Sequence, residues 1–329
     1  MSVSLESADD ECLAPGTHTG DGISMIGYAI RRFLQFVFVL LVLSALVFSL
    51  LHLSGNPAAL LLPANATQEQ VEQMSRSLGL DDPIHVQYFR YLGNVLRGDL
   101  GMSYRLKLPV AQVIGIYLPN TLALAGLSIL FATVLSLILG VAAALRRDTY
   151  IDTLATLGAT VGQSMPTFWL AILLLLLFCV KLKWLPVSGT GSWRNYILPT
   201  VTMGWYSTAF LTRVIRSNLL EVLQSDYVQV ARSKGLREWR VILKHAFRNA
   251  LLPVITIWGL QLGTMMMGSV VTETVFAWPG VGRLSAESVL GRDYPVVLGM
   301  ILLYGAIFSF LNVCVDISYA VLDPRITYK

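Results

Sequence analysis

Residues 108–145 read LPVAQVIGIYLPNTLALAGLSILFATVLSLILGVAAAL and contain no charged side chain. Five more stretches share this property: residues 33–68, 153–180, 195–212, 249–272 and 294–315. A helix of about 20 apolar residues can cross a bilayer, because it bonds every backbone N–H and C=O within the segment. The pattern predicts an all-α polytopic membrane protein with about six transmembrane helices, near residues 33–53, 119–145, 154–180, 196–216, 253–276 and 295–320.

The overall composition supports a chain solvated by lipid. Of the 329 residues, 55% are hydrophobic and 13% are charged, whereas soluble domains carry about 25% charged residues. The net charge of +4 could suggest nucleic acid, but positive charge in membrane proteins gathers in cytoplasmic loops, so we expect no nucleic-acid partner. The three cysteines, Cys12, Cys179 and Cys314, lack the spacing of a metal site or a disulfide framework, and no cofactor is expected.

Lys and Arg side chains predict the orientation in the membrane. The segment between the fourth and fifth predicted spans holds eight of them: Arg213, Arg216, Arg232, Lys234, Arg237, Arg240, Lys244 and Arg248. Short loops rich in Lys and Arg stay in the cytoplasm. An even number of crossings then places both termini in the cytoplasm as well.

The chain divides into four predicted parts. Residues 1–24 are polar and acidic, without the basic start of a signal peptide, and are expected to be a disordered extension; the alternative is that Met25 is the true start. Residues 25–53 form the first transmembrane helix. Residues 54–118 form an extracytoplasmic loop with helices, and residues 119–329 form a core with five transmembrane helices and a cytoplasmic loop at 216–252.

The extracytoplasmic loop shows two helix signals. Thr67 and Gln70 have the spacing of a capping box, which predicts a helix start. Apolar residues at helical spacing predict a second helix over 84–97, ending at Gly98. The loop is either a structured connector or a docking element for a delivery protein.

The cytoplasmic loop 216–252 is predicted to contain two amphipathic helices joined at Gly235. Apolar side chains recur at helical spacing from Leu219 to Ala231, and again from Trp239 to Ala250. A glycine between such stripes is typical of a helix end, and Pro253 suits the first turn of the next span. The elbow either lies on anionic lipid or inserts into a groove of a cytoplasmic partner.

The same loop resembles a known family. ARSKGL at 231–236 and LKHAFRNALLP at 243–253 resemble the conserved cytoplasmic loop of ABC importer permeases, in the dipeptide/oligopeptide (nickel, glutathione) family and its first-permease branch. Gln229 and Val230 depart from the general loop pattern, and Asn56 stands where the family more often has Asp. Further matching stretches, in order along the chain, are 98–101, 118–122, 164–169, 185–189, 272–282, 292–295, 312–316 and 323–325.

This resemblance implies the type I ABC importer permease fold and a bacterial inner membrane location. The chain would form half of a peptide translocation pathway; a nickel or glutathione importer is the alternative. The expected partners are one or two kinds of ATP-binding subunit, a second homologous permease in a heterodimer, an extracytoplasmic binding protein and the lipid bilayer. No phosphate-binding loop is present in the sequence, so the chain is not expected to be an enzyme, and ATP would be hydrolysed by partner chains.

Two groups of candidate site residues follow. Docking to the ATPase is expected to involve Asp226, Tyr227, Ala231, Lys234, Gly235 and Leu236. Glu273, Trp278 and Asp316 lie near span ends and are expected to serve gating or structure rather than substrate binding.

Two other functional classes are weaker. A stand-alone secondary transporter or channel would more often carry ionisable residues within its spans, and the charge-free windows have none. A membrane enzyme would need a nucleophile with its base or a cluster of metal ligands, and the sequence offers neither.

Overall fold

The computed structural model describes residues 25–53, 58, 62, 66–77, 79–242 and 247–322. These residues are largely helical and form no β-strand; one isolated bridge joins Met102 to Pro109. The predicted all-α class is confirmed. The expectations for residues 1–24, for Asn56 and for residues 323–325 lie outside the described residues.

Five helices are long: α1 (Met25–Leu53), α5 (Val110–Leu145), α8 (Arg194–Leu223), α11 (Phe247–Val275) and α13 (Tyr294–Leu322). The shorter helices are α3 (Gln68–Ser77), α4 (Ile84–Leu96), α6 (Tyr150–Ser164), α7 (Thr167–Leu174), α9 (Asp226–Ser233), α10 (Glu238–Arg240) and α12 (Val281–Leu290). A π-helix, η1 (Leu175–Lys181), continues α7 directly.

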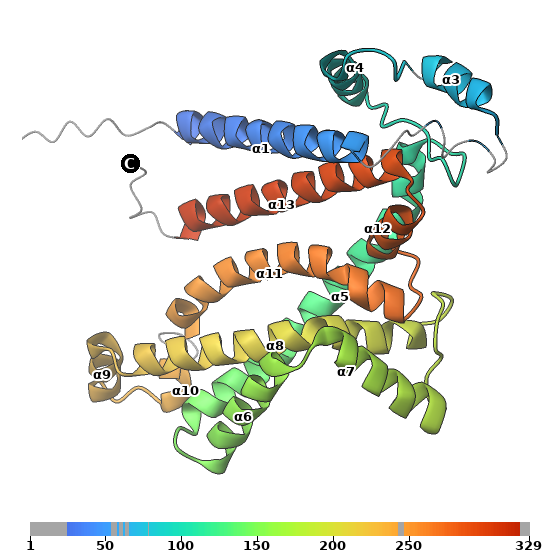
Figure 1. The fold of residues 1–329 in the computed structure, drawn as a ribbon. Helices are drawn as coiled ribbons and strands as arrows, with labels where there is room; N and C mark the ends of the chain where they lie inside the picture. Colours follow the sequence, from blue (N-terminus) through green and yellow to red (C-terminus); the bar gives the residue numbers. More distant parts are fainter. Residues whose placement is uncertain are drawn as a thin grey trace, which may run out of the picture.

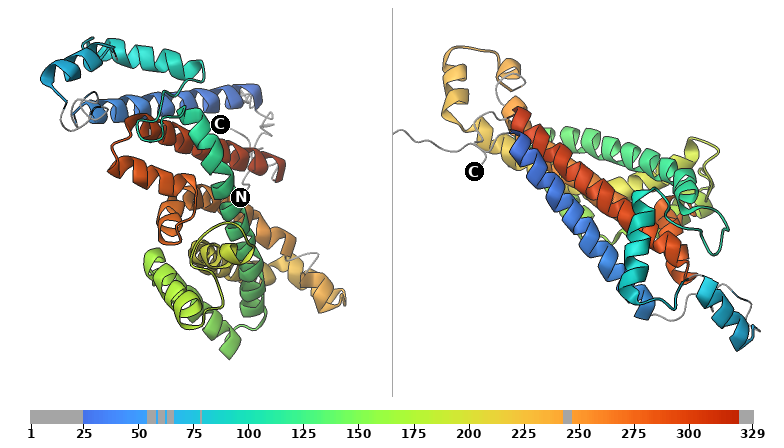
Figure 2. Two further views of the ribbon diagram at one scale, coloured as in Figure 1. Left: turned by 90° about the vertical axis from the view of Figure 1, so that its right-hand side faces the viewer. Right: turned by 90° about the horizontal axis from the view of Figure 1, so that it is seen from above.

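The helices form an elongated bundle with different elements at its two ends (Figures 1 and 2). α1 packs beside α13, α11 joins α13 to α8, and α5 packs along α8. α9 and α10 project from one end, whereas α3, α4 and α12 lie at the other. The start of α1 and the end of α13 lie at the same end as α9.

Glycines let α5 and α8 approach closely. A Cβ added to Gly140 of α5 would lie 2.9 Å from Ile215, and one added to Gly204 of α8 would lie 2.8 Å from the backbone oxygen of Ser128. The largest buried apolar cluster, which includes Leu124 of α5 and residues of α8 and α11, lies around this contact. Small residues at helix interfaces maximise van der Waals contact where lipid offers no hydrophobic drive for helix association.

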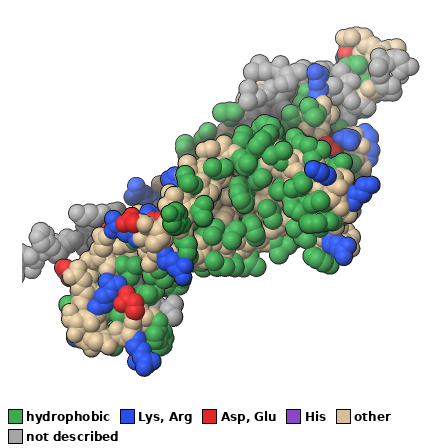
Figure 3. Space-filling model, turned by 90° about the horizontal axis from the view of Figure 1, so that it is seen from below, with side chains coloured by type: hydrophobic (Ala, Val, Ile, Leu, Met, Phe, Trp, Pro, Cys, Tyr) green, Lys and Arg blue, Asp and Glu red, His purple; other side chains and the backbone are tan. Residues whose placement is uncertain are grey.

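The outer surface of the bundle is apolar over its middle. Figure 3 shows a broad hydrophobic face, with Lys and Arg gathered toward the ends. Phe38 of α1, Leu130 of α5 and Leu157 of α6 are each more than half exposed. A continuous apolar surface of this kind indicates contact with lipid. By length and composition, α5 and residues Tyr294–Val315 of α13 can each cross a membrane.

The third predicted span is not one straight helix. α6 and the α7–η1 helix are bent by 104° relative to each other at a short break. Pro166 causes the break: it has no N–H for the helix ladder, and it forces the residue before it into an extended conformation, with Met165 at φ −78° and ψ 122°. The prediction of a continuous helix over 154–180 was therefore wrong. The bent pair can count as one crossing, and crossings by α1, α8 and α11 stay predictions.

Other helix bounds also differ from the expected ones. α5 begins at Val110, so residue 119 lies inside a helix, and α8 continues past residue 216 to Leu223. α11 begins at Phe247, so Pro253 lies within the helix and does not open it. α8 and α11 extend beyond their charge-free windows at both ends, whereas α5 lies within its window of residues 108–145. The division of the chain into four parts stays a prediction.

The two helix signals in the predicted loop of residues 54–118 are confirmed. The Thr67 N–H donates to Gln70 Oε1 over 3.0 Å, and the Gln70 N–H donates to Thr67 Oγ1 over 3.4 Å, which is the reciprocal pattern of a capping box. α4 occupies the second predicted helix.

Candidate functional site

The loop predicted to be cytoplasmic forms an elbow of short helices at the end of α8, here defined as residues 224–242. Gln224 and Ser225 interrupt the helix that was predicted to continue from Leu219 through Ala231, and α9 starts at Asp226. Ser225 is extended at the N-cap, and an acid follows it in the first turn. This pair is a helix-start signal that sequence reasoning missed.

Gly235 makes the sharp turn between α9 and α10. Its φ of +71° is left-handed, as predicted for a glycine at a helix end. An ion pair closes the turn: Arg232 Nη2 lies 2.6 Å from Glu238 Oε1. The hydrogen bond to Glu238 raises the pKa of Arg232 above its ordinary value. Both side chains are substantially exposed, so the pair orients the turn more than it stabilises the fold.

One face of the elbow is packed against the ends of three long helices. Val228 and Ala231 of α9, with Val241, join a buried cluster. The other members of that cluster are Leu219 of α8, Ala144 of α5 and Ala250 of α11. A movement of the elbow must therefore displace the ends of these helices, because a packed apolar core deforms little.

A second set of polar contacts lies at the opposite end of the bundle, where α11 turns into α12. Glu273 is fully buried. Thr121 Oγ1 donates to Glu273 Oε1 over 2.7 Å, and the Arg283 N–H donates to Oε2 over 2.9 Å. Trp278, 1% exposed, donates from Nε1 to the Asn120 carbonyl over 3.2 Å. These contacts fasten the α11–α12 turn to α5.

Asp316, the third residue predicted to serve gating or structure, does not lie beside Glu273 and Trp278. Glu273 and Trp278 come together at the start of α12, whereas Asp316 lies toward the end of α13. The described residues contain no group of three or more His, Cys, Asp or Glu side chains that could hold a metal ion.

Residues 136–328 match the family described as "Binding-protein-dependent transport system inner membrane component", and residues 25–125 match the corresponding N-terminal family. The chain belongs to this family. It is a permease subunit of an ABC importer, as the resemblance implied. Such permeases are non-catalytic, ATP hydrolysis belongs to partner subunits, and an extracytoplasmic substrate-binding protein is the other implied partner.

Individual relatives of the permease cover nearly its whole length. It is 42% identical over 306 residues to the glutathione transport system permease protein GsiC of Salmonella paratyphi A, covering 93% of this chain and 100% of the relative. The protein of the same name from Escherichia coli (strain K12) is 41% identical over the same length and coverage. A solved structure of the MetNI methionine ABC transporter has a TM-score of 0.53 at 18% identity, and covers 64% of this chain and 97% of that one. It supports the permease fold.

The permease's predicted docking residues occupy both faces of the elbow. Asp226, Lys234 and Gly235 are exposed, and Tyr227 and Leu236 are 43% and 37% exposed. Ala231 instead faces inward at 7% exposure and supports the elbow from beneath.

Two exposed apolar residues of the elbow were missing from the predicted set. Val230 is 53% exposed and Trp239 is 55% exposed, with the Arg240 guanidinium 5.3 Å from the Trp239 ring. Both residues belong to the apolar stripes seen in the sequence. The stripes alone do not show which apolar side chains pack inward and which are exposed on the outer face of the elbow.

Proposed function

We propose that this permease forms half of the translocation pathway of an ATP-driven importer for glutathione or a closely related short peptide. The observation that carries the proposal is the identity of 41–42%, over nearly the full chain, to permeases named for glutathione transport. The sequence alone favoured peptides in general. The relatives favour its glutathione alternative, and glutathione is itself a peptide.

The elbow is the proposed docking site for the ATPase subunits in the cytoplasm. Its segment of the chain carries the densest group of Lys and Arg, which favours a cytoplasmic position. The start of α1 and the end of α13 lie at the same end of the bundle (Figures 1 and 2), in line with both termini being cytoplasmic in a bacterial inner membrane. Leu236, Val230 and Trp239 offer an exposed apolar surface that suits a groove on a partner.

The proposed mechanism is alternating access. ATP binding would change the groove of the partner, and the elbow would follow as a rigid body because its inner face is packed on the ends of α5, α8 and α11. Such coupling requires that the elbow make different contacts in the two states. The other half of the pathway would come from a second, homologous permease.

The substrate is tested by uptake. The complete transporter, produced in cells lacking their own glutathione import, is expected to accumulate labelled glutathione, and the same cells without this permease are not. A labelled dipeptide and a nickel chelate serve as competitors. Uptake of the nickel chelate, with no inhibition by excess glutathione, would contradict the substrate assignment.

Docking is tested by a charge in the exposed apolar surface of the elbow. Leu236→Asp is expected to lower the amount of ATPase subunit that copurifies with the permease by about tenfold, because a desolvated contact carries much of the binding energy at a small interface. Leu290→Asp is the matched control, since Leu290 is 86% exposed on α12 at the other end of the bundle. Equal copurification of both variants would refute docking at the elbow.

A further inference from the structure

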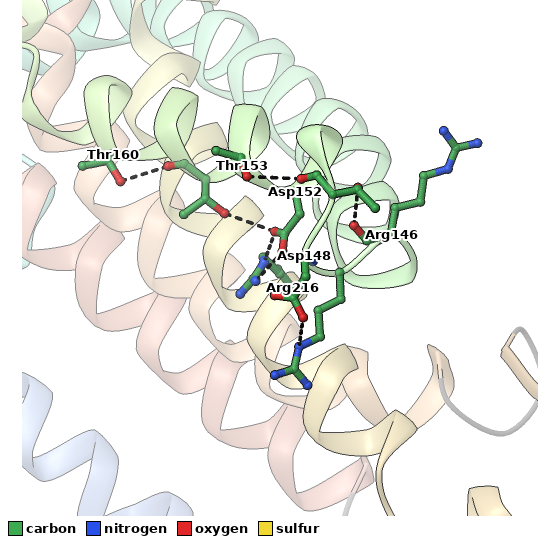
Figure 4. Close-up of polar contacts among 9 residues, drawn as sticks. Arg146, Asp148, Asp152, Thr153, Thr160 and Arg216 are labelled. Atoms are coloured by element: carbon green, nitrogen blue, oxygen red, sulfur yellow. Dashed lines mark hydrogen bonds and ion pairs between the residues drawn. The ribbon is translucent and has the colours of Figure 1, made fainter.

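A partly buried ion pair links α6 to α8 (Figure 4), close to the end of α8 that leads into the elbow. Arg216 of α8 donates from Nε to Asp152 Oδ1 over 2.5 Å and from Nη2 to Asp152 Oδ2 over 2.7 Å. The side chain of Asp152 is 7% exposed and that of Arg216 is 27% exposed. Two parallel bonds from a planar guanidinium fix orientation as well as distance, so this pair holds α6 and α8 in one relative position.

Asp152 also accepts hydrogen bonds from the loop that joins α5 to α6 and from α6 itself. The backbone N–H of Asp148 donates to Asp152 Oδ2 over 3.1 Å, and Thr156 Oγ1 donates to Oδ1 over 3.3 Å. Asp148 is in the left-handed region, with φ +60°. One carboxylate therefore connects the α5–α6 loop, α6 and α8.

Arg216 lies on the same continuous helix that carries the elbow. α8 runs without a break to Leu223, and only Gln224 and Ser225 separate it from α9. α9 in turn packs on Leu219 of α8. A rigid movement of the elbow therefore carries Arg216 with it, and the ion pair passes that movement to the start of α6.

α6 can change its angle relative to α7 because it ends at a break in the helix that can act as a hinge. The break at Met165 and Pro166 separates it from α7, which is turned by 104°. A few residues at the end of an element can absorb a change of angle while the helices on either side stay intact. Among the residues that the structure describes, α6 and α8 share one further polar contact between side chains, an exposed hydrogen bond of 2.9 Å from Arg213 Nη1 to Gln163 Oε1. A single bond of this kind cannot fix orientation in the same way.

We propose that Asp152 and Arg216 are positioning residues for transport: they transmit the movement of the elbow to the bent α6–α7 segment. This inference rests on the proposed docking of the ATPase at the elbow. It assigns a role in coupling to a contact outside the elbow, between residues that are far apart in the sequence.

The test uses the complete transporter in proteoliposomes, with imported substrate and hydrolysed ATP measured in the same sample. Asp152→Asn is expected to assemble and to hydrolyse ATP, but to import about tenfold less substrate per ATP, a size typical of a lost coupling between sites. A merely structural role would lower import and hydrolysis together, so an unchanged ratio overturns the proposal.

Two further variants keep the test decisive if Asp152→Asn assembles poorly. Arg216→Lys keeps the charge but loses the fork, and its ratio of import to hydrolysis is expected to fall below that of the wild type. Arg213→Gln removes the exposed hydrogen bond and is expected to keep the wild-type ratio. The proposal is contradicted if Arg216→Lys keeps the wild-type ratio of import to hydrolysis. It is also contradicted if this ratio falls as much in Arg213→Gln as in Arg216→Lys.

The outcome separates this inference from the docking proposal. If Leu236→Asp releases the ATPase subunits while the Asp152 and Arg216 variants keep the wild-type ratio, only the transmission role fails. If Leu236→Asp retains the ATPase subunits, docking at the elbow fails whatever the ratio is.

Discussion

Gly235→Val is expected to leave the permease in the membrane and to abolish most substrate-stimulated ATP hydrolysis and transport of the assembled complex. The reason lies in the backbone. Gly235 has φ +71°, and a Cβ added there would meet no heavy atom within 4 Å. Crowding by neighbours is therefore absent, but a β-branched residue is strongly disfavoured at this φ, by about 1–2 kcal/mol or more. The turn would open, and α10 would leave its place beside α9.

The control for this prediction is Gly235→Asn, because Asn tolerates the left-handed region better than other residues with side chains. It is expected to retain much of the stimulated hydrolysis at equal membrane abundance. Stimulated hydrolysis at the wild-type level in Gly235→Val would show that the shape of the elbow does not carry the coupling.

Glu273→Ala is expected to have the second large effect, through folding. The substitution removes the acceptor of the Thr121 hydroxyl and of the Arg283 N–H at a fully buried position. Each buried donor left without a partner costs about 1–3 kcal/mol, so the loss from the two donors is about 2–6 kcal/mol in total. The thermal midpoint of the purified complex in detergent should fall, and the α11–α12 turn should become sensitive to protease.

Glu273→Gln provides the comparison, because its amide oxygen can still accept one of the two bonds. It is expected to be more stable than Glu273→Ala. If Glu273→Ala kept the wild-type thermal midpoint and lost only uptake, the residue would have to act in gating and not in anchoring.

The sequence predicted the features that depend on local chemistry. Charge-free windows located the long helices, since charged side chains are costly in lipid. The Thr67–Gln70 capping box was readable because its partners are three residues apart. Gly235 was readable because its position after a helical stripe demands a left-handed residue.

Two local signals were available but were not used. Pro166 stood in the middle of the third charge-free window, and hydropathy outweighed its effect on the helix ladder. Ser225 with Asp226 marks a helix start inside a stripe that appeared continuous. In both cases a break in the backbone was hidden by an uninterrupted apolar pattern.

The remaining contacts could not be predicted, because they join residues far apart in the chain. Asp152 meets Arg216, and Glu273 meets Thr121, only after the helices have packed. The sequence shows each acid near the end of an apolar segment, and nothing in its neighbours identifies the partner.

The bend at Pro166 decides the parity of the membrane crossings. If the bent segment returned to the side from which it entered, it would not count as a crossing, and the number of crossings would be odd. At its start, however, Asp152 bonds to Arg216, toward the end of α8, and at its far end Cys179 packs with Leu198, near the start of α8. Those two points on α8 are about 27 Å apart at 1.5 Å per residue, close to the thickness of the hydrocarbon layer. The bent segment therefore runs antiparallel to α8 over about this length, and we expect it to count as a full crossing despite its shape.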